Sequence, residues 1–240
     1  MEGHQIAVAG LVVDVVRKDI KHLHLAVYPP AGRVRVAAPL RLDDEAVRLA
    51  VVSRLGWIRQ QQAKFAEQER ETEREYLSGE SHYFQGARYR LNVIYQAGRP
   101  GVAVRNNRML DLIVRPGSDR AQRERVMLEW YRQQLKDELA RLVPRWEQAI
   151  GVTATQVGVK QMKTKWGTCN TRARRLWLNL ELAKKPARCL EFVLVHELVH
   201  LLERHHNAQF QGLMDRHLPQ WRLLRDELNR EPLGHATWDY

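Results

Sequence analysis

Several features that would assign a protein class are scarce or missing in this sequence. Only two of the 240 residues are cysteines, Cys169 and Cys189, which excludes a disulfide-held scaffold and favours a reducing, cytoplasmic setting. No apolar run approaches the roughly 20 residues of a membrane-spanning helix, so we expect no membrane partner. The N-terminus lacks a basic start followed by an apolar stretch and therefore predicts no secretory signal. Internal repeats and low-complexity tracts are also missing from the sequence.

Acidic residues are in deficit as well. The formal net charge is +11, and such a balance favours contact with polyanions, so nucleic acid is one candidate partner. The basic residues are spread along the chain without a named nucleic-acid-binding motif, which favours a solvated basic surface without a specific partner. Hydrophobic residues make up 44% of the chain, enough to fill the core of a globular protein. The sequence leaves the oligomeric state open.

The first half of the chain predicts β structure. Apolar and polar residues alternate on both sides of a Pro-Pro-Ala-Gly turn at 29–32, which indicates a hairpin. A helix near 44–75 is expected next, because apolar residues recur there at helical spacing. Further strands are expected after it, including a short hairpin around Asn106 and Asn107. We therefore expect a β-rich N-terminal region over 1–117 that contains one long helix.

The second half of the chain predicts a more helical region, 118–240. Ser118 or Asp119 is expected to begin a long helix, which Pro144 is expected to kink or end. The segment 163–182 then indicates a strand, a turn at Gly167 and a returning strand. An edge strand at this position can pair with an extended substrate, or it can simply cover the helix that follows. The expected fold class for the whole chain is α+β.

The strongest chemical signal is the sequence His196-Glu197-Leu198-Val199-His200. Its flanks are apolar on nearly every side, which predicts a buried helix. Two histidines four residues apart project from the same face of a helix and can bind one zinc ion. Glu197 lies beside the first histidine, where its carboxylate can reach a water on the metal without binding the metal itself.

A third candidate ligand, His206, follows six residues after His200. This spacing suits a ligand that comes after a turn, and Asn207 can cap a new helix directly behind it. Three protein ligands leave a fourth position for water, as in catalytic zinc sites, where the pKa of the water falls to about 7. Glu197 is then the expected general base. His205 can replace His206 as a ligand, bond to substrate or face solvent.

Core histidines offer a simpler interpretation of the same residues. Three histidines at these intervals next to a glutamate would, however, bury several polar side chains without compensation, which disfavours that interpretation. The metal-site hypothesis is therefore the stronger one. The two cysteines are isolated from each other in the sequence and indicate no second zinc site.

These stretches resemble the YgjP-like metallopeptidase family, which is related to the SprT-like zinc proteases. The resemblance implies a zincin-like metallopeptidase domain over 118–240, with His196, His200 and His206 as zinc ligands and Glu197 as catalytic base. It extends more weakly to the N-terminal hairpin and to the helix near 44–75. SprT-like relatives act near DNA, so the resemblance also implies a DNA-associated protease as a hypothesis. The matching residues are Trp166-Gly167-Thr168-Cys169, Leu178-Asn179, Leu182, Pro186, His196-Glu197-Leu198-Val199-His200, His206 and Phe210.

The leading hypothesis is a zinc-dependent metallopeptidase that cleaves protein or peptide substrates with a Zn²⁺ cofactor. One alternative is a zinc-dependent hydrolase of a non-peptide bond, since the same chemistry cleaves amides and esters in small molecules. Another is a nucleic-acid-associated protein, either with a secondary metal site or with protease activity that DNA recruits. The basic charge of the chain is the feature that favours this last alternative.

Overall fold

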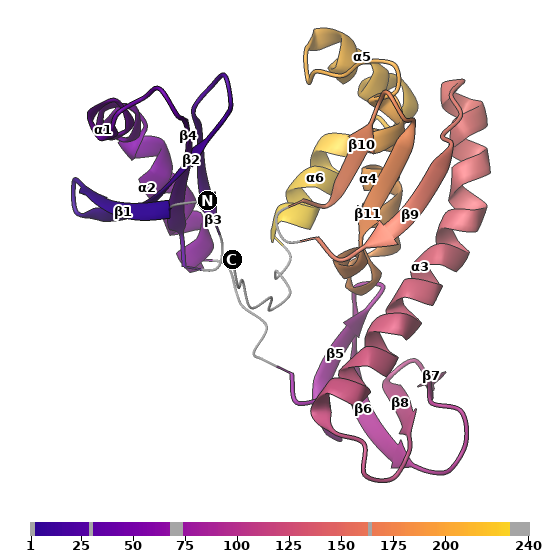
Figure 1. Cartoon of the computed structure of the whole chain (residues 1–240). Coiled ribbons are helices and arrows are strands. Elements are labelled where there is room, and N and C mark those ends of the chain that lie inside the picture. Colours follow the sequence, from indigo (N-terminus) through magenta and orange to yellow (C-terminus); the bar gives the residue numbers. More distant parts are fainter. Residues whose placement is uncertain (1–2, 29–30, 68–73, 163–164, 231–240) are drawn as a thin grey trace. The chain divides into compact units, whose positions relative to one another are not determined.

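The chain forms two compact units, Met1–Glu69 and Arg70–Tyr240. They are shown in Figure 1, a computed structural model that describes residues 3–28, 31–67, 74–162 and 165–230. Six α-helices and three sheets lie within these ranges, so the fold is mixed α and β, as expected. None of the helices in the described ranges is long and apolar enough to cross a membrane.

In the first unit, a four-stranded sheet shares its core with two helices. The sheet has the order β1-β2-β4-β3, in which β2 and β4 run parallel and the two outer pairs are antiparallel. The antiparallel β3–β4 pair confirms the predicted hairpin. Buried residues of β1, β2 and β4 pack with residues of both helices. The strands are β1 (Gly3–Val8), β2 (Leu11–Lys18), β3 (His24–Tyr28) and β4 (Arg33–Pro39).

The helix expected near 44–75 consists of two helices, α1 (Asp44–Val52) and α2 (Leu55–Glu67). Ser53 ends α1, because its N–H donates to the Leu49 carbonyl and its hydroxyl donates to the Ala50 carbonyl. The single long helix predicted from the sequence was therefore wrong. The part of that prediction that falls on 68–73 lies outside the described residues.

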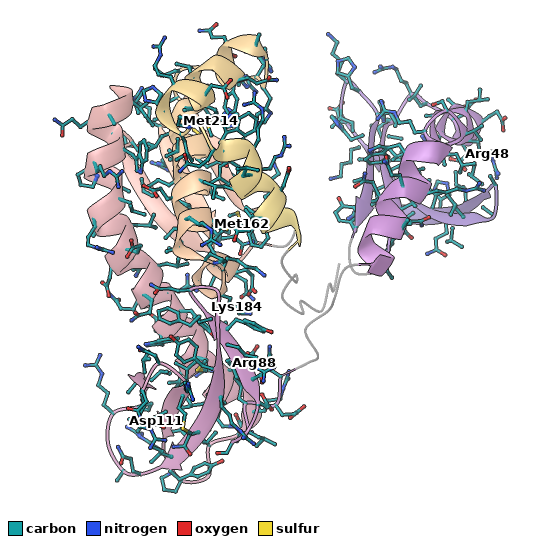
Figure 2. All side chains as sticks on the ribbon, turned by 180° about the vertical axis from the view of Figure 1, so that it is seen from behind. Arg48, Arg88, Asp111, Met162, Lys184 and Met214 are labelled. Atoms are coloured by element: carbon teal, nitrogen blue, oxygen red, sulfur yellow. The ribbon has the colours of Figure 1, made fainter. Side chains whose placement is uncertain are left out.

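The second unit begins with another four-stranded sheet of the same topology, β5-β6-β8-β7, again with one central parallel pair. The sequence carries no detectable repeat, because strand pairing requires only alternating burial and suitable turns. Asn106 and Asn107 form the predicted hairpin turn with φ values of 52° and 50°. Asp111 of β8, labelled in Figure 2, accepts a hydrogen bond from Asn92 of β6 at 2.7 Å. The strands are β5 (Ser81–Phe84), β6 (Ala87–Tyr95), β7 (Gly101–Arg105) and β8 (Met109–Val114).

Helix α3 (Arg120–Ile150) connects this sheet to the rest of the second unit, as Figure 1 shows. Asp119 caps its N-terminus, as predicted, in a reciprocal pair of hydrogen bonds with Gln122. The helix continues through Pro144 and ends at Gly151, whose φ is 77°. Pro144 therefore does not end the helix, because residues on both sides of it are buried in the core, and this packing offsets the missing hydrogen bond.

A three-stranded sheet and three helices complete the second unit. The sheet order is β10-β11-β9, so β10 is an edge strand. The strand expected to continue to Leu182 instead ends at Asn179, whose side chain accepts a hydrogen bond from the Glu181 N–H at 3.2 Å and begins the 3₁₀ helix η1. The elements are β9 (Gln156–Lys160), β10 (Gly167–Asn170), β11 (Arg175–Asn179), η1 (Leu180–Lys184), α4 (Ala187–Val199), α5 (Ala208–His217) and α6 (Trp221–Arg230).

The division of the chain at 69/70 differs from the boundary expected at 117/118. All eight strands described before residue 117 were expected to form one region, but β5 to β8 share a core with α3. The Tyr131 hydroxyl of α3, for example, donates to the Tyr83 carbonyl of β5 at 2.7 Å. The sequence pattern identifies strands by their alternation, and it does not reveal which helix they pack against.

The N-cap of α3 provides a test of this fold. Replacing Asp119 with alanine removes the acceptor that lies 2.7 Å from the Gln122 N–H. We expect Asp119→Ala to lower the free energy of unfolding of the second unit by about 1 kcal/mol. Urea unfolding followed by tryptophan fluorescence measures this, because Trp57 is the only tryptophan before residue 70. Asp119→Asn, which keeps an acceptor, should be close to wild type, and equal losses in both variants would contradict the assignment.

Candidate metal centre

Helix α4 positions the first part of the site. Nine of its 13 residues are buried, and it packs against α3, α5, α6 and the β9–β11 sheet. His196 and Glu197 lie in its last turn, and His200 is its C-cap residue. The near-continuous apolar surface leaves the helix little freedom to rotate, because any rotation would expose core residues. The backbone of α4 therefore fixes where these three side chains begin.

Three histidine rings meet at the end of this helix. The possible ligand atoms of His196, His200 and His206 all lie within 4.8 Å of one another, so these three residues can hold a metal ion together. The Nε2 atoms of His196 and His206 are 3.0 Å apart. His205 lies outside this cluster and is exposed, with its backbone N–H donating to the Glu203 carboxylate at 2.9 Å. The structure thus brings together the three predicted ligands and leaves His205 at the surface.

Neighbouring groups orient the rings of the cluster. The Nδ1 atom of His200 is 3.1 Å from the Glu203 carbonyl oxygen, which leaves Nε2 for a metal. Such a carbonyl partner is the usual orienting contact of a metal-bound histidine. Asn207 caps α5, as predicted, by accepting a hydrogen bond from the Phe210 N–H at 3.0 Å. Because the cap residue directly follows His206, the start of α5 fixes the position of the His206 backbone.

Phe210 forms a common packing surface for all three histidines. Its ring centroid is 5.0 Å from that of His196 and 4.7 Å from those of His200 and His206. Its side chain is 1% exposed, so the ring is held by the core and cannot move aside. The sequence indicates that Phe210 lies on the inner face of α5, but its contact with three separate ring positions emerges only from the fold.

Burial keeps His196 and His200 in the form that binds metals. Burial, with smaller contributions from the nearby His200 and His206, lowers the pKa of His196 to about 3. Burial also lowers the pKa of His200, and the Glu203 carbonyl partly opposes this shift. A neutral imidazole has a free lone pair for a metal, whereas a protonated one has none. The donor set therefore fits a divalent metal ion at neutral pH.

Glu197 lies beside the cluster and is 6% exposed. Burial raises the pKa of its carboxyl group to about 8, while the positive charge of Lys165 acts in the opposite direction. A cation at the histidine cluster would favour the ionised carboxylate in the same way as Lys165 does. Glu197 thus places a buried carboxylate beside a histidine cluster that can bind a metal cation.

Gly167 makes room for this carboxylate. A Cβ atom at position 167 would lie 2.5 Å from Glu197 Oε1 and 2.7 Å from Glu197 Cγ, closer than atoms can approach. The turn expected at Gly167 was wrong, because Gly167 is the first residue of β10 and the chain turns only after Asn170. Glycine is required here for close approach to helix α4 rather than for backbone conformation.

Asn179 is a second residue whose role the sequence pattern did not reveal. Its side-chain amide donates to the carbonyl oxygens of Met162 and Lys165, at 2.9 and 2.8 Å, and its backbone N–H donates to that of Trp166. The residue is 5% exposed, and these bonds hold the chain that leads into β10. Its place in the Leu-Asn motif was the only signal for it in the sequence.

The histidines and Glu197 line a cleft of about 650 Å³. Its lining includes the edge strand β10 with the turn after it, as well as Arg204 and His206. Cys169 faces this cleft, and burial together with the Glu197 carboxylate raises the pKa of its thiol to about 11, which disfavours the reactive thiolate. Elsewhere in the described ranges, no other group of three metal-binding side chains was found.

The helix with paired histidines, the third histidine after a turn and the buried glutamate together define a metallohydrolase type of site. The comparison with protein families identifies the particular family. The family model described as "YgjP-like, metallopeptidase domain" matches residues 21–231. The chain therefore belongs to this family of metallopeptidases. The match begins in the first unit and includes the whole site.

Two solved structures are similar to part of the chain. The crystal structure of the metallopeptidase zymogen of Pyrococcus abyssi abylysin has 16% identity and a TM-score of 0.36, covering 40% of this chain and 99% of that one. The crystal structure of the metallopeptidase zymogen of Methanocaldococcus jannaschii jannalysin has 15% identity and a TM-score of 0.35. The similarity covers 38% of this chain and 87% of that one. No curated protein matches the chain significantly.

The contact between Gly167 and Glu197 predicts a specific defect. Gly167→Ala should displace the carboxylate and lower peptidase kcat/KM by about 100-fold, since small misplacements of a reacting group have effects of this size. Metal content should stay at the wild-type level, because the three atoms nearest to the new methyl group all belong to Glu197 and none belongs to a histidine. Gly212→Ala is the matched control, as a Cβ there meets nothing within 4 Å. Full activity of Gly167→Ala would contradict this role.

Proposed function

We propose that this protein is a zinc-dependent metallopeptidase with a zincin-like catalytic domain. His196, His200 and His206 are the proposed zinc ligands, and Glu197 is the proposed general base. The observation that carries the proposal is the convergence of three histidine donors within 4.8 Å, next to a buried glutamate that lines the same cleft. Three imidazoles favour zinc among the common divalent metals, and they leave a coordination position open for catalysis.

The chemistry divides between the metal and the chain. Zinc, when bound, supplies a Lewis acid that polarises a carbonyl oxygen and lowers the pKa of water. The Glu197 carboxylate accepts the proton of the attacking water and returns it to the leaving nitrogen. Its burial, with Gly167 packed closely against it, strengthens this proton transfer because little solvent competes. The Phe210 ring and the Glu203 carbonyl keep the histidines oriented throughout.

An extended polypeptide is the proposed substrate. β10 pairs with β11 on one side only, and its other edge carries backbone groups without a neighbouring strand in the described sheet. A peptide can add there as a further strand, which would bring its backbone across the cleft beside Glu197. A hydrolase of a small non-peptide substrate would have no use for such an edge. This feature favours peptide substrates over the alternative hydrolase.

Metal content tests the ligand assignment. Purified without chelators, the wild-type protein should contain about one zinc per chain, and His200→Ala should contain far less. His205→Ala is the matched control, because His205 is the adjacent exposed histidine outside the cluster and should leave zinc unchanged. Inductively coupled plasma mass spectrometry on the three proteins measures this. A wild-type protein that neither contains nor takes up a divalent metal would overturn the proposal.

Cleavage of a diverse peptide library tests the reaction and the role of Glu197. The zinc-loaded wild type should yield defined cleavage products, detected by mass spectrometry. Glu197→Gln should retain zinc and cleave about 10²–10⁴-fold more slowly, the usual effect of losing a general base. Two results would count against these roles: loss of zinc in Glu197→Gln, or a wild-type protein that hydrolyses small esters and amides but no peptide.

A further inference from the structure

The positive charge of this protein is concentrated in one unit. Residues 1–69 contain ten Lys and Arg against eight Asp and Glu, a formal charge of +2. Residues 70–240 contain 29 basic and 20 acidic residues, a formal charge of +9. The unit that holds the candidate metal centre therefore has nearly all of the excess charge. The sequence alone shows this charge as evenly spread, because the boundary between the units is not visible in it.

Three of these cations line the cleft itself. They are Lys165, Arg172 and Arg204, and all three are exposed. Among the described residues, the only carboxylate in the cleft lining is the buried Glu197. Within the described part of the chain, none of the three cations forms an ion pair with an acidic side chain. Their charges are thus available to a bound molecule.

Outside the cleft, the cations of the second unit are of both kinds. Some exposed arginines are paired with carboxylates, such as Arg188 with Glu227 and Arg222 with Asp215, and others, such as Arg125, have no acidic partner among the described residues. In the cleft, three cations without an acidic partner gather on one concave surface. This local excess of positive charge favours an acidic ligand.

The positions of the cations relate to the edge strand. Lys165 precedes β10 by two residues, and Arg172 follows its last residue by two. The four residues of β10 span roughly 13 Å at about 3.3 Å per residue. A peptide strand paired with β10 would therefore have one cation near each end. Arg204 also lines the cleft and lies between His200 and His206 in the sequence.

A polypeptide fits this cleft better than a nucleic acid. Single-stranded nucleic acid is usually held by aromatic side chains on which its bases stack. The lining that the described residues form contains no Phe, Tyr or Trp, only histidines, cations, Glu197 and small or polar residues. It does contain the edge strand, whose backbone groups match those of an extended peptide. The cations then recognise carboxylates on the peptide rather than phosphates.

We propose that the cleft selects polypeptide segments with acidic side chains on both sides of the scissile bond. Lys165 and Arg172 recognise these side chains near the two ends of the bound strand, and Arg204 recognises them from the segment between the second and third histidines. The inference rests on the proposed peptidase function and specifies the substrate class of the same site. An exposed ion pair improves affinity by a factor of about 1.5 to 5, so several together give about tenfold at low salt.

Binding to a non-cleaving variant tests this selectivity. Three fluorescein-labelled peptides share one central sequence and have flanks of Glu, Gln or Lys, and fluorescence anisotropy measures their binding to zinc-loaded, full-length Glu197→Gln. We expect the Glu-flanked peptide to bind about tenfold more tightly than the Gln-flanked one at low salt. This advantage should shrink at 0.5 M NaCl, because surface charges are screened. Equal binding of the three peptides would overturn the inference.

Further variants identify the cations responsible. Arg172→Gln and Arg204→Gln, combined in the Glu197→Gln background, should remove most of the preference for the Glu-flanked peptide. Arg125→Gln is the matched control, because Arg125 is an exposed arginine of α3 that does not line the cleft. Lys165 is left intact, since its charge also acts on Glu197. An undiminished preference in the double Arg variant would show that other residues provide it and would overturn the assignment.

Two more measurements separate the competing outcomes. A single-stranded oligonucleotide that displaces the Glu-flanked peptide at equal or lower concentration would show that the cleft binds nucleic acid, which also overturns the inference. Cleavage of the same three peptides by the wild type distinguishes the two proposals. Equal cleavage of all three contradicts acidic selectivity and leaves the peptidase function intact. Absence of cleavage of any peptide, including the diverse library, contradicts the peptidase function itself.

Discussion

Burial of helix α4 is the constraint on which the rest of the second unit depends. The same 13 residues provide a central part of the core and carry His196 and Glu197. Helices α3, α5 and α6 and the β9–β11 sheet all pack against α4. The apolar surroundings that stabilise the fold therefore also limit the access of water to Glu197, which is 6% exposed. Function and stability are coupled here because one helix serves both.

This burial acts in opposite directions on the two kinds of titratable group at the site. It lowers the pKa of His196 to about 3 and raises that of Glu197 to about 8, and in both cases the neutral form is favoured. Without a bound metal ion, these two groups therefore carry little charge at neutral pH, which limits the cost of burying them. A divalent cation suits both groups, since it binds neutral imidazole and favours the ionised carboxylate.

The residues that act through local chemistry were predictable from the sequence. Histidine spacing, the Asn207 cap and the Asn-Asn hairpin each depend on a few adjacent positions. The roles that depend on distant contacts were not. Gly167 is needed because Glu197, 30 residues later, lies against it, and Pro144 is tolerated because both halves of α3 are packed. The boundary between the units was missed for the same reason, since a sheet's packing partner is not encoded in its alternation.

Lys165 joins the site to its surroundings. Its charge lowers the pKa of Glu197, against the effect of burial, and it also lines the cleft beside β10. The Asn179 amide holds the Lys165 carbonyl at 2.8 Å, so the backbone from which this side chain extends is fixed by the core. An acidic group bound beside Lys165 would neutralise part of that charge and weaken its effect on Glu197. The charge of an acidic substrate and the pKa of Glu197 would therefore be coupled through one lysine, because the substrate's carboxylate and Glu197 both interact with the Lys165 ammonium group.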